Sequence, residues 1–278
     1  MRTPLLISIA VAAASVAGCT VGSGSGAAMG PLWILGCRPD GDPLGTPGDP
    51  YAFDLDPTFF AAEPIEDISD GPPMNRLTIR MQRNGNATEI NDTLYFDIRD
   101  SAQIARCVRG ATINGVPTWD TTSGTLDELG QVDPNAPPWC VQAATPDQLP
   151  QIRLVPFGPV AVSFTPFATC HSSMHPPAIV NVTGVANGGL ITFTDFGGAV
   201  QPNQANTPPD ARVPIDRDFQ VNYGGHLQAT FQFDVEDARV AAAIRDKIVP
   251  PSAPLIGGML GGNFEFFFER GRSAQTFP

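Results

Sequence analysis

Apolar and polar residues alternate with a period of two along much of the chain beyond residue 75. This spacing is typical of strands that bury one face. Pro- and Gly-rich loops separate the stretches, which predicts a mainly β fold, an antiparallel β-sandwich of about seven or more strands. The stretches are 77–82, 93–99 and 227–235, with shorter ones at 160–164, 190–195, 219–223 and 264–268.

One segment near the C-terminus has helical spacing instead. Val240, Ile244 and Ile248 recur every four residues, which predicts an apolar stripe on one helix face. Acidic residues at 236 and 237 occupy the predicted first turn, and prolines at 250 and 251 end the helix. The sequence therefore predicts one or two short helices beside the strands.

The first nineteen residues have the pattern of an export signal. Arg2 precedes an apolar and small-residue run from Leu5 to Ala14, which is too short for a membrane-spanning helix of about 20 residues. Val16, Ala17, Gly18 and Cys19 follow in the arrangement of a bacterial lipobox. In these residues the chain resembles a bacterial lipoprotein precursor.

This resemblance implies a signal peptide at 1–18 and a lipid-bearing Cys19 as the first residue of the mature chain. Thr20, in place of Asp, implies sorting to the outer membrane, on a face that the sequence leaves open. Residues 19–50 are rich in Gly, Pro and Asp and include Gly22 to Gly26, so we expect a flexible tether there. The β-sandwich domain is then expected at 51–278.

The charge of the chain bears on its partners. The sequence holds 28 acidic and 16 basic residues, a formal net charge of −12. Such a surface repels phosphate backbones, which argues against nucleic acid as a partner. The partners that we expect are a membrane, through the lipid anchor, and an envelope protein or a glycan.

Four cysteines remain besides Cys19, namely Cys37, Cys107, Cys140 and Cys170. An even number in an exported chain predicts two disulfides, and four cysteines allow three connectivities. Cys107 and Cys140 flank a turn-rich excursion, so we favour that pair, which leaves Cys37 with Cys170.

Two segments carry possible metal ligands, although no cofactor is required by the sequence. His171, Met174 and His175 fall within five residues, and imidazole with thioether suits copper. The ligand order differs from that of a cupredoxin loop, and an ordinary surface loop is the alternative. A second, acidic stretch suits calcium if it forms a loop, the alternative being a solvated acidic loop. Its residues are Asp54, Asp56, Glu63, Glu66, Asp67 and Asp70.

The sequence contains no Gly-x-Ser-x-Gly, His-Glu-x-x-His, phosphate-binding glycine loop or Ser-x-x-Lys with its partner motifs. The hypothesis is therefore a cell-envelope lipoprotein with a structural, adhesive or partner-binding role. The alternatives are a metal-binding protein and a carbohydrate-active enzyme whose two carboxylates carry no diagnostic spacing. His226, after Tyr223-Gly224-Gly225, is assigned no role.

Overall fold

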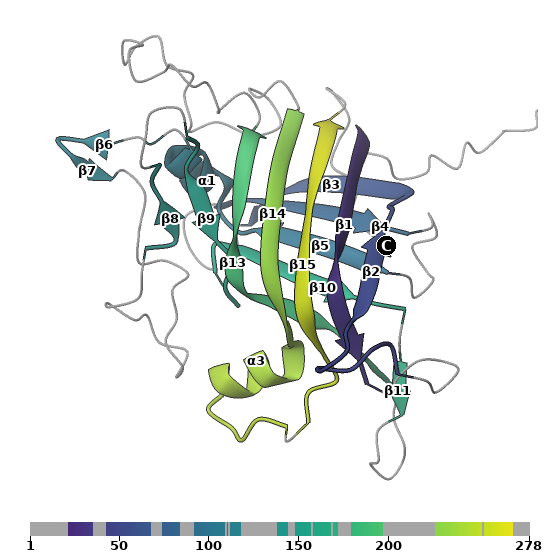
Figure 1. Ribbon diagram of the computed structural model, residues 1–278. Coiled ribbons are helices and arrows are strands. Elements are labelled where there is room, and N and C mark those ends of the chain that lie inside the picture. Colours follow the sequence, from purple (N-terminus) through teal and green to yellow (C-terminus); the bar gives the residue numbers. More distant parts are fainter. Residues whose placement is uncertain are drawn as a thin grey trace, which may run out of the picture.

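The computed structural model describes residues 22–35, 43–67, 74–83, 92–108, 110, 112–117, 138–143, 148–156, 158–167, 169–171, 179–196, 226–251 and 253–268. The prediction of a mainly β protein with few helices is confirmed (Figure 1). Within these ranges no helix combines the length and the apolar character needed to cross a membrane. The predicted strand at 219–223 lies outside the described residues.

The main sheet has eleven strands and is antiparallel. Nine follow the order β2-β1-β15-β14-β13-β10-β5-β4-β3, while β9 pairs with β13 and β8 with β9. The strands are β1 (Gly22–Ile34), β2 (Tyr51–Leu55), β3 (Phe59–Asp67), β4 (Met74–Gln82), β5 (Thr93–Ile98), β8 (Cys140–Val141), β9 (Gln151–Arg153), β10 (Val160–Thr165), β13 (Gly184–Phe196), β14 (His226–Asp237) and β15 (Ile256–Phe268). Two small hairpins lie apart, β6 (Thr112–Ile113) with β7 (Val116–Pro117) and β11 (Thr169–His171) with β12 (Ile179–Asn181).

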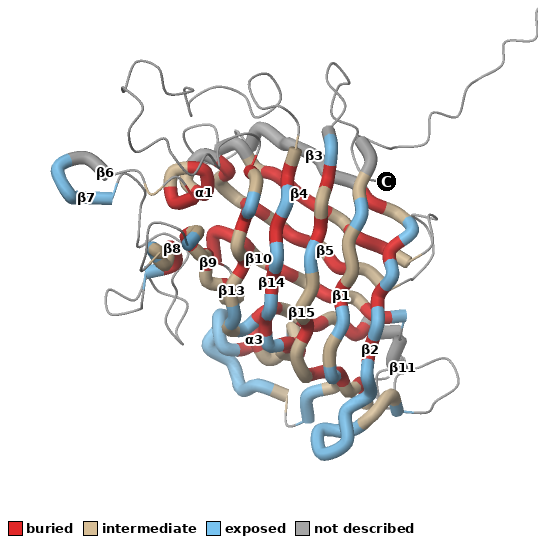
Figure 2. The backbone as a smooth tube through the Cα atoms, turned by 45° about the horizontal axis from the view of Figure 1, so that its top comes forward, coloured by how far each residue is buried: buried red, intermediate tan, exposed pale blue. Residues whose placement is uncertain are grey.

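The sheet curls strongly, so that its two halves face one another across the core (Figures 1 and 2). β2 and β3 are joined by only three residues, yet they stand at opposite ends of the strand order. β3 also contacts β1 and β15. One continuous, strongly curled sheet thus encloses the core, and the sandwich arrangement that the sequence predicted is not confirmed.

Phenylalanine rings from both halves fill the core. Phe96 of β5 packs edge-to-face against Phe231 of β14 and Phe264 of β15, with ring centroids 5.0 and 5.1 Å apart. All three rings are buried, as the period-two pattern predicted for their strands. The same alternation places the even-numbered side chains of β14, such as Gln228 and Gln232, on the outer face.

The favoured disulfide, Cys107–Cys140, is confirmed. It links α1 (Ser101–Val108) to β8, with a Cα–Cα distance of 5.9 Å. Both cysteines are buried, so the bond fastens the helix to the sheet through the core. Cys37 and the side chain of Cys170 lie outside the described residues, so their pairing stays a prediction.

The expected tether is wrong for much of its length. Gly22–Ile34 forms β1, which pairs with β15 on one side and β2 on the other. Residues 43–50 also continue the fold, because Leu44 exchanges backbone hydrogen bonds with Ile34. The folded part therefore includes residues well before 51. Glycine in this strand permits close approach rather than disorder, since a Cβ on Gly26 would lie 2.5 Å from the Asn263 carbonyl oxygen.

The predicted C-terminal helix exists, but it ends before Ile248 and does not bury the face that carries the predicted apolar stripe. α3 spans Ala238–Arg245, with Asp237 as its N-cap and Glu236 still in β14. Its buried residues are Ala241 and Ala243, whereas the predicted stripe leaves Ile244 and Ile248 exposed. Only small side chains allow the helix to lie close against β13 and β14, which both contact it.

Candidate functional site

Four long strands, β1, β15, β14 and β13, build the largest described outer face of the sheet (Figure 1). In the middle of this face, β14 and β15 present uncharged hydrogen-bonding groups, and charged residues lie toward its two ends. Gln228, Thr230, Gln232 and Asn263 are all exposed. Because their neighbours on the same strands point into the core, these polar groups form a continuous row above it.

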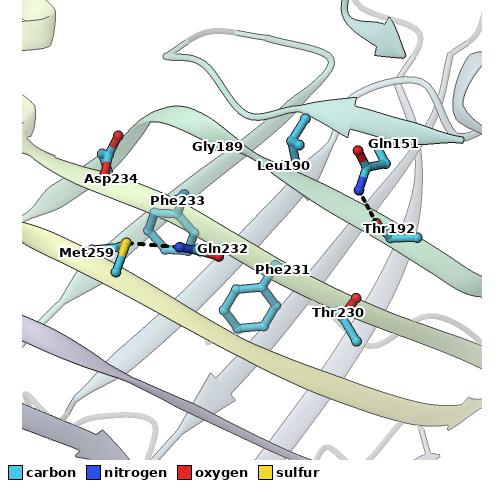
Figure 3. Close-up of a pocket in the computed structure, with 10 residues that line it drawn as sticks. All are labelled: Gln151, Gly189, Leu190, Thr192, Thr230, Phe231, Gln232, Phe233, Asp234 and Met259. Atoms are coloured by element: carbon cyan, nitrogen blue, oxygen red, sulfur yellow. Dashed lines mark hydrogen bonds between the residues drawn. The ribbon is translucent and has the colours of Figure 1, made fainter. Parts of the chain in front are cut away.

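A concavity of about 410 Å³ opens in this face (Figure 3). It lies where the β13–β14 register shifts between Ala186 and Gly189. Gln232 Nε2 donates to Met259 Sδ over 3.0 Å at one side, and Gln151 Nε2 donates to Thr192 Oγ1 over 3.3 Å at the other. Asp234 is the one charged residue among those that line it. The concavity therefore offers a partner hydrogen-bonding groups and a single carboxylate.

A charged cluster closes the same face at the end where β1 and β14 begin. His226 Nδ1 lies 2.7 Å from Asp195 Oδ2, and its Nε2 lies 2.9 Å from Glu265 Oε1. The imidazole also stacks on Phe267, with ring centroids 4.4 Å apart. Three strands thus meet at one histidine, because Asp195 is on β13 and Glu265 on β15.

The two carboxylates decide the protonation of His226. Partial burial alone would lower the pKa of His226, but the hydrogen bonds to Asp195 and Glu265 outweigh burial and raise this pKa. Both carboxylates accept, so both ring nitrogens must donate, which is the imidazolium form. A general base needs a free ring lone pair. The arrangement therefore suits a structural tie between strands better than proton abstraction.

The predicted metal ligands are distributed as follows. His171 is in β11, its side chain lies outside the described part of the chain, and so do Met174 and His175. The described part of the acidic stretch is mostly strand rather than loop, which corrects that expectation. Asp54 is in β2 with Asp56 just after it, and Glu63, Glu66 and Asp67 are in β3 at the opposite end of the strand order.

Asp70 and the side chains of the β3 acids are outside the described residues. Among the side chains that are described, no three His, Cys, Asp or Glu residues gather as a metal group. Sequence reasoning missed the His226 cluster. Its members are 31 and 39 residues apart and meet only through strand register, for which the sequence carries no local signal.

Comparisons with known proteins return no matching family model, no matching curated protein and no matching solved structure.

Proposed function

We propose that this protein is a lipid-anchored binding module of the cell envelope, with Cys19 as the lipidated residue. The observation that carries the proposal is the distance along the chain between the lipobox and the sheet. β1 begins at Gly22, three residues after Cys19, and three residues span at most about 11 Å. Lipidation of Cys19 would therefore hold one particular end of the sheet close to the bilayer.

Strand register identifies that end. Ser23 of β1 and His226 of β14 both pair with Phe267 of β15. The His226 cluster would thus lie near the membrane, and α3, at the other end of β14, would point away from it (Figure 1). The outer face would run between them, exposed to partners along its length.

The composition of the outer face supports a binding role. Its glutamine, threonine and asparagine side chains donate and accept hydrogen bonds without adding to the net charge of −12. A neutral polar partner, either an envelope protein surface or a glycan, could satisfy these groups without electrostatic repulsion. Aligned strands also offer such a partner a regular spacing of contacts.

Site-directed photocrosslinking in cells tests the proposal. A photoreactive amino acid at Gln232 should capture a reproducible envelope partner, and the added change Thr230→Arg should abolish capture by placing a long cation in the same face. The same probe at Val116, in the separate exposed hairpin β6–β7, is the control and should not capture that partner. Cys19→Ala should release the protein from membranes. Capture that is equal from both probe positions would contradict the binding face.

A further inference from the structure

A second concavity lies at the end of β1 that is distant from Cys19. It has a volume of about 550 Å³, within the range of about 300–1,000 Å³ typical of small-molecule sites. Its residues come from β2, from the end of β1, from the segment before β2, and from positions just after β4, just before β5 and just after β10. These are Ile34, Leu44, Tyr51, Phe53, Asp54, Arg83, Asp92, Pro166 and Phe167. We call this site the β2 groove.

Two aromatic rings remain uncovered in the β2 groove. Tyr51 is 49% exposed and Phe167 is 51% exposed, whereas Phe53, on the same strand as Tyr51, is buried against Phe164. The backbone of Tyr51 is held in the sheet, because it pairs with Leu32. The backbone of Phe167 is held because its amide donates to Asp92 Oδ1 over 3.0 Å. Exposed aromatic rings on an ordered backbone offer a ligand apolar contact area at low cost in conformational entropy.

An ion pair forms the polar wall of the groove. Arg83 Nε lies 3.3 Å from Asp92 Oδ2, and an Nη of the same guanidinium donates to the Asp54 carbonyl oxygen. The Arg83 amide also donates to the Asp92 carbonyl oxygen over 3.0 Å. Backbone and side-chain bonds thus fix a donor and an acceptor side by side, as vicinal hydroxyl groups require.

The charges of the wall disfavour an anionic ligand. The Arg83 guanidinium balances Asp92, so the Asp54 carboxylate is the uncompensated charge of the lining. The ion pair itself offers a neutral ligand both a donor and an acceptor, and a cation is the competing ligand that choline tests in the experiment below. A ligand that has flat apolar C–H faces for the rings and paired hydroxyls for the wall satisfies both surfaces. We propose that the β2 groove binds a neutral carbohydrate.

This proposal deepens the proposed function and rests on it for the orientation of the groove. Tyr51 pairs with Leu32, which is ten residues from Gly22 along β1 (32 minus 22). At a rise of about 3.3 Å per residue, the groove lies about 33 Å from the anchored end. It would therefore face away from the membrane that holds Cys19, where a saccharide can reach it.

The test is saturation-transfer NMR and calorimetry on the full-length protein in lauryldimethylamine oxide, a detergent without a sugar headgroup. The probes are cellobiose, maltose and N,N′-diacetylchitobiose, with choline and benzoate as charged comparators. At least one disaccharide should bind, and choline and benzoate should not. Tyr51→Ala and Phe167→Ala should each weaken binding about tenfold, the usual effect of losing an aromatic contact.

Phe267→Ala is the matched control, because this ring is 48% exposed but stacks on His226 at the other end of the sheet. Tyr51→Leu keeps apolar bulk without the ring, so it replaces Tyr51→Ala if that variant does not fold. Binding of no disaccharide overturns the proposal, as does binding that Phe267→Ala weakens as much as Phe167→Ala. Neither result depends on membrane attachment, so failure here is distinguishable from failure of the lipid anchor.

Discussion

Nδ1 of His226 lies 2.7 Å from Oδ2 of Asp195, and this contact ties the start of β14 to the end of β13. Glu265 accepts from the other ring nitrogen, which extends the tie to β15. The side chain of His226 is 23% exposed, so water weakens but does not remove the attraction. The cluster is therefore a pH-dependent contribution to stability at the membrane-proximal end of the proposed module.

The pKa of His226 is raised by its carboxylate partners, so its contribution should be complete below the unfolded-state pKa of about 6.5 and be lost as pH rises through the folded-state pKa. We expect His226→Gln to lower the free energy of unfolding by about 1 kcal/mol at pH 6 and to have little effect at pH 9. Urea unfolding across this range measures the difference. The double change His171→Gln and His175→Gln is the control, and an equal loss from it would argue against the His226 cluster as the cause.

Substitution of Asp237 should lower the free energy of unfolding more than substitution of an exposed acidic residue on the same strand. Its side chain is 3% exposed and accepts from the backbone amides of Arg239 (2.9 Å) and Leu255 (2.7 Å). Burial alone would raise the pKa of Asp237, but bonds from Arg239 and Leu255 outweigh it and lower this pKa. We expect Asp237→Asn to cost about 2 kcal/mol of unfolding free energy at pH 7.

The lowered pKa of Asp237 also fixes the direction of its pH dependence. Its contribution is present above the unfolded-state pKa of about 3.9 and is lost as pH falls through the folded-state pKa. The difference between Asp237→Asn and the unmodified protein should therefore shrink in acid. Asp234→Asn, at an exposed position of the same strand, is the control and should change stability by less than about 0.5 kcal/mol. A cost that persists unchanged at low pH would show that the charge of Asp237 is not its cause.

Removal of the Cys107–Cys140 bond should destabilise the fold markedly. The two residues are 33 positions apart, and closing a loop of that length is worth about 3–4 kcal/mol in the chain-entropy account. The double change Cys107→Ser and Cys140→Ser isolates this bond from the other cysteines, and chemical denaturation measures the loss. A loss below about 1 kcal/mol would mean that packing of α1 holds this region without the bond.

Adjacent glycines of β15 should respond differently to the same substitution. A Cβ on Gly262 would lie 2.0 Å from the Ala27 carbonyl oxygen and 2.9 Å from the Phe231 ring, whereas the nearest atom to a Cβ on Gly261 is 3.5 Å away. We expect Gly262→Ala to cost about 1–3 kcal/mol and Gly261→Ala to be close to neutral. Thermal unfolding of the two variants compares them directly, and equal melting temperatures would contradict the close β1–β15 pairing.

The sequence predicted best those strands in which apolar and polar side chains alternate, because this alternation indicates which face is buried. Residues 77–82 and 227–235 alternate strictly, and Leu77, Ile79 and Phe231 are buried as expected. β1 was missed because Gly22, Gly24 and Gly26 have no side chains, and Ser23 and Ser25 are small and polar, so none of them signals a buried face. That strand is defined by its partners β15 and β2, and pairing between distant segments leaves no mark in local composition.

The packing of α3 and the location of the two sites also depend on contacts between distant segments, which local sequence does not reveal. Val240, Ile244 and Ile248 matched a helical stripe, yet α3 stops at Arg245 and packs through Ala241 and Ala243. Whether α3 buries large apolar side chains or small ones depends on the distance between the helix and strands β13 and β14. The spacing of apolar residues in the sequence does not encode this distance. The His226 cluster and the β2 groove likewise arise from register and from the curl of the sheet.

The most direct test of the central claim is the mass of the N-terminal peptide of the protein purified from the membrane fraction of its native cells. The account predicts a peptide that begins at Cys19 and carries acyl groups, and it predicts that Cys19→Ala removes both the modification and the membrane association. A mature chain in the aqueous fraction with an unmodified Cys19, or one that retains residues 1–18, would contradict a lipid-anchored module.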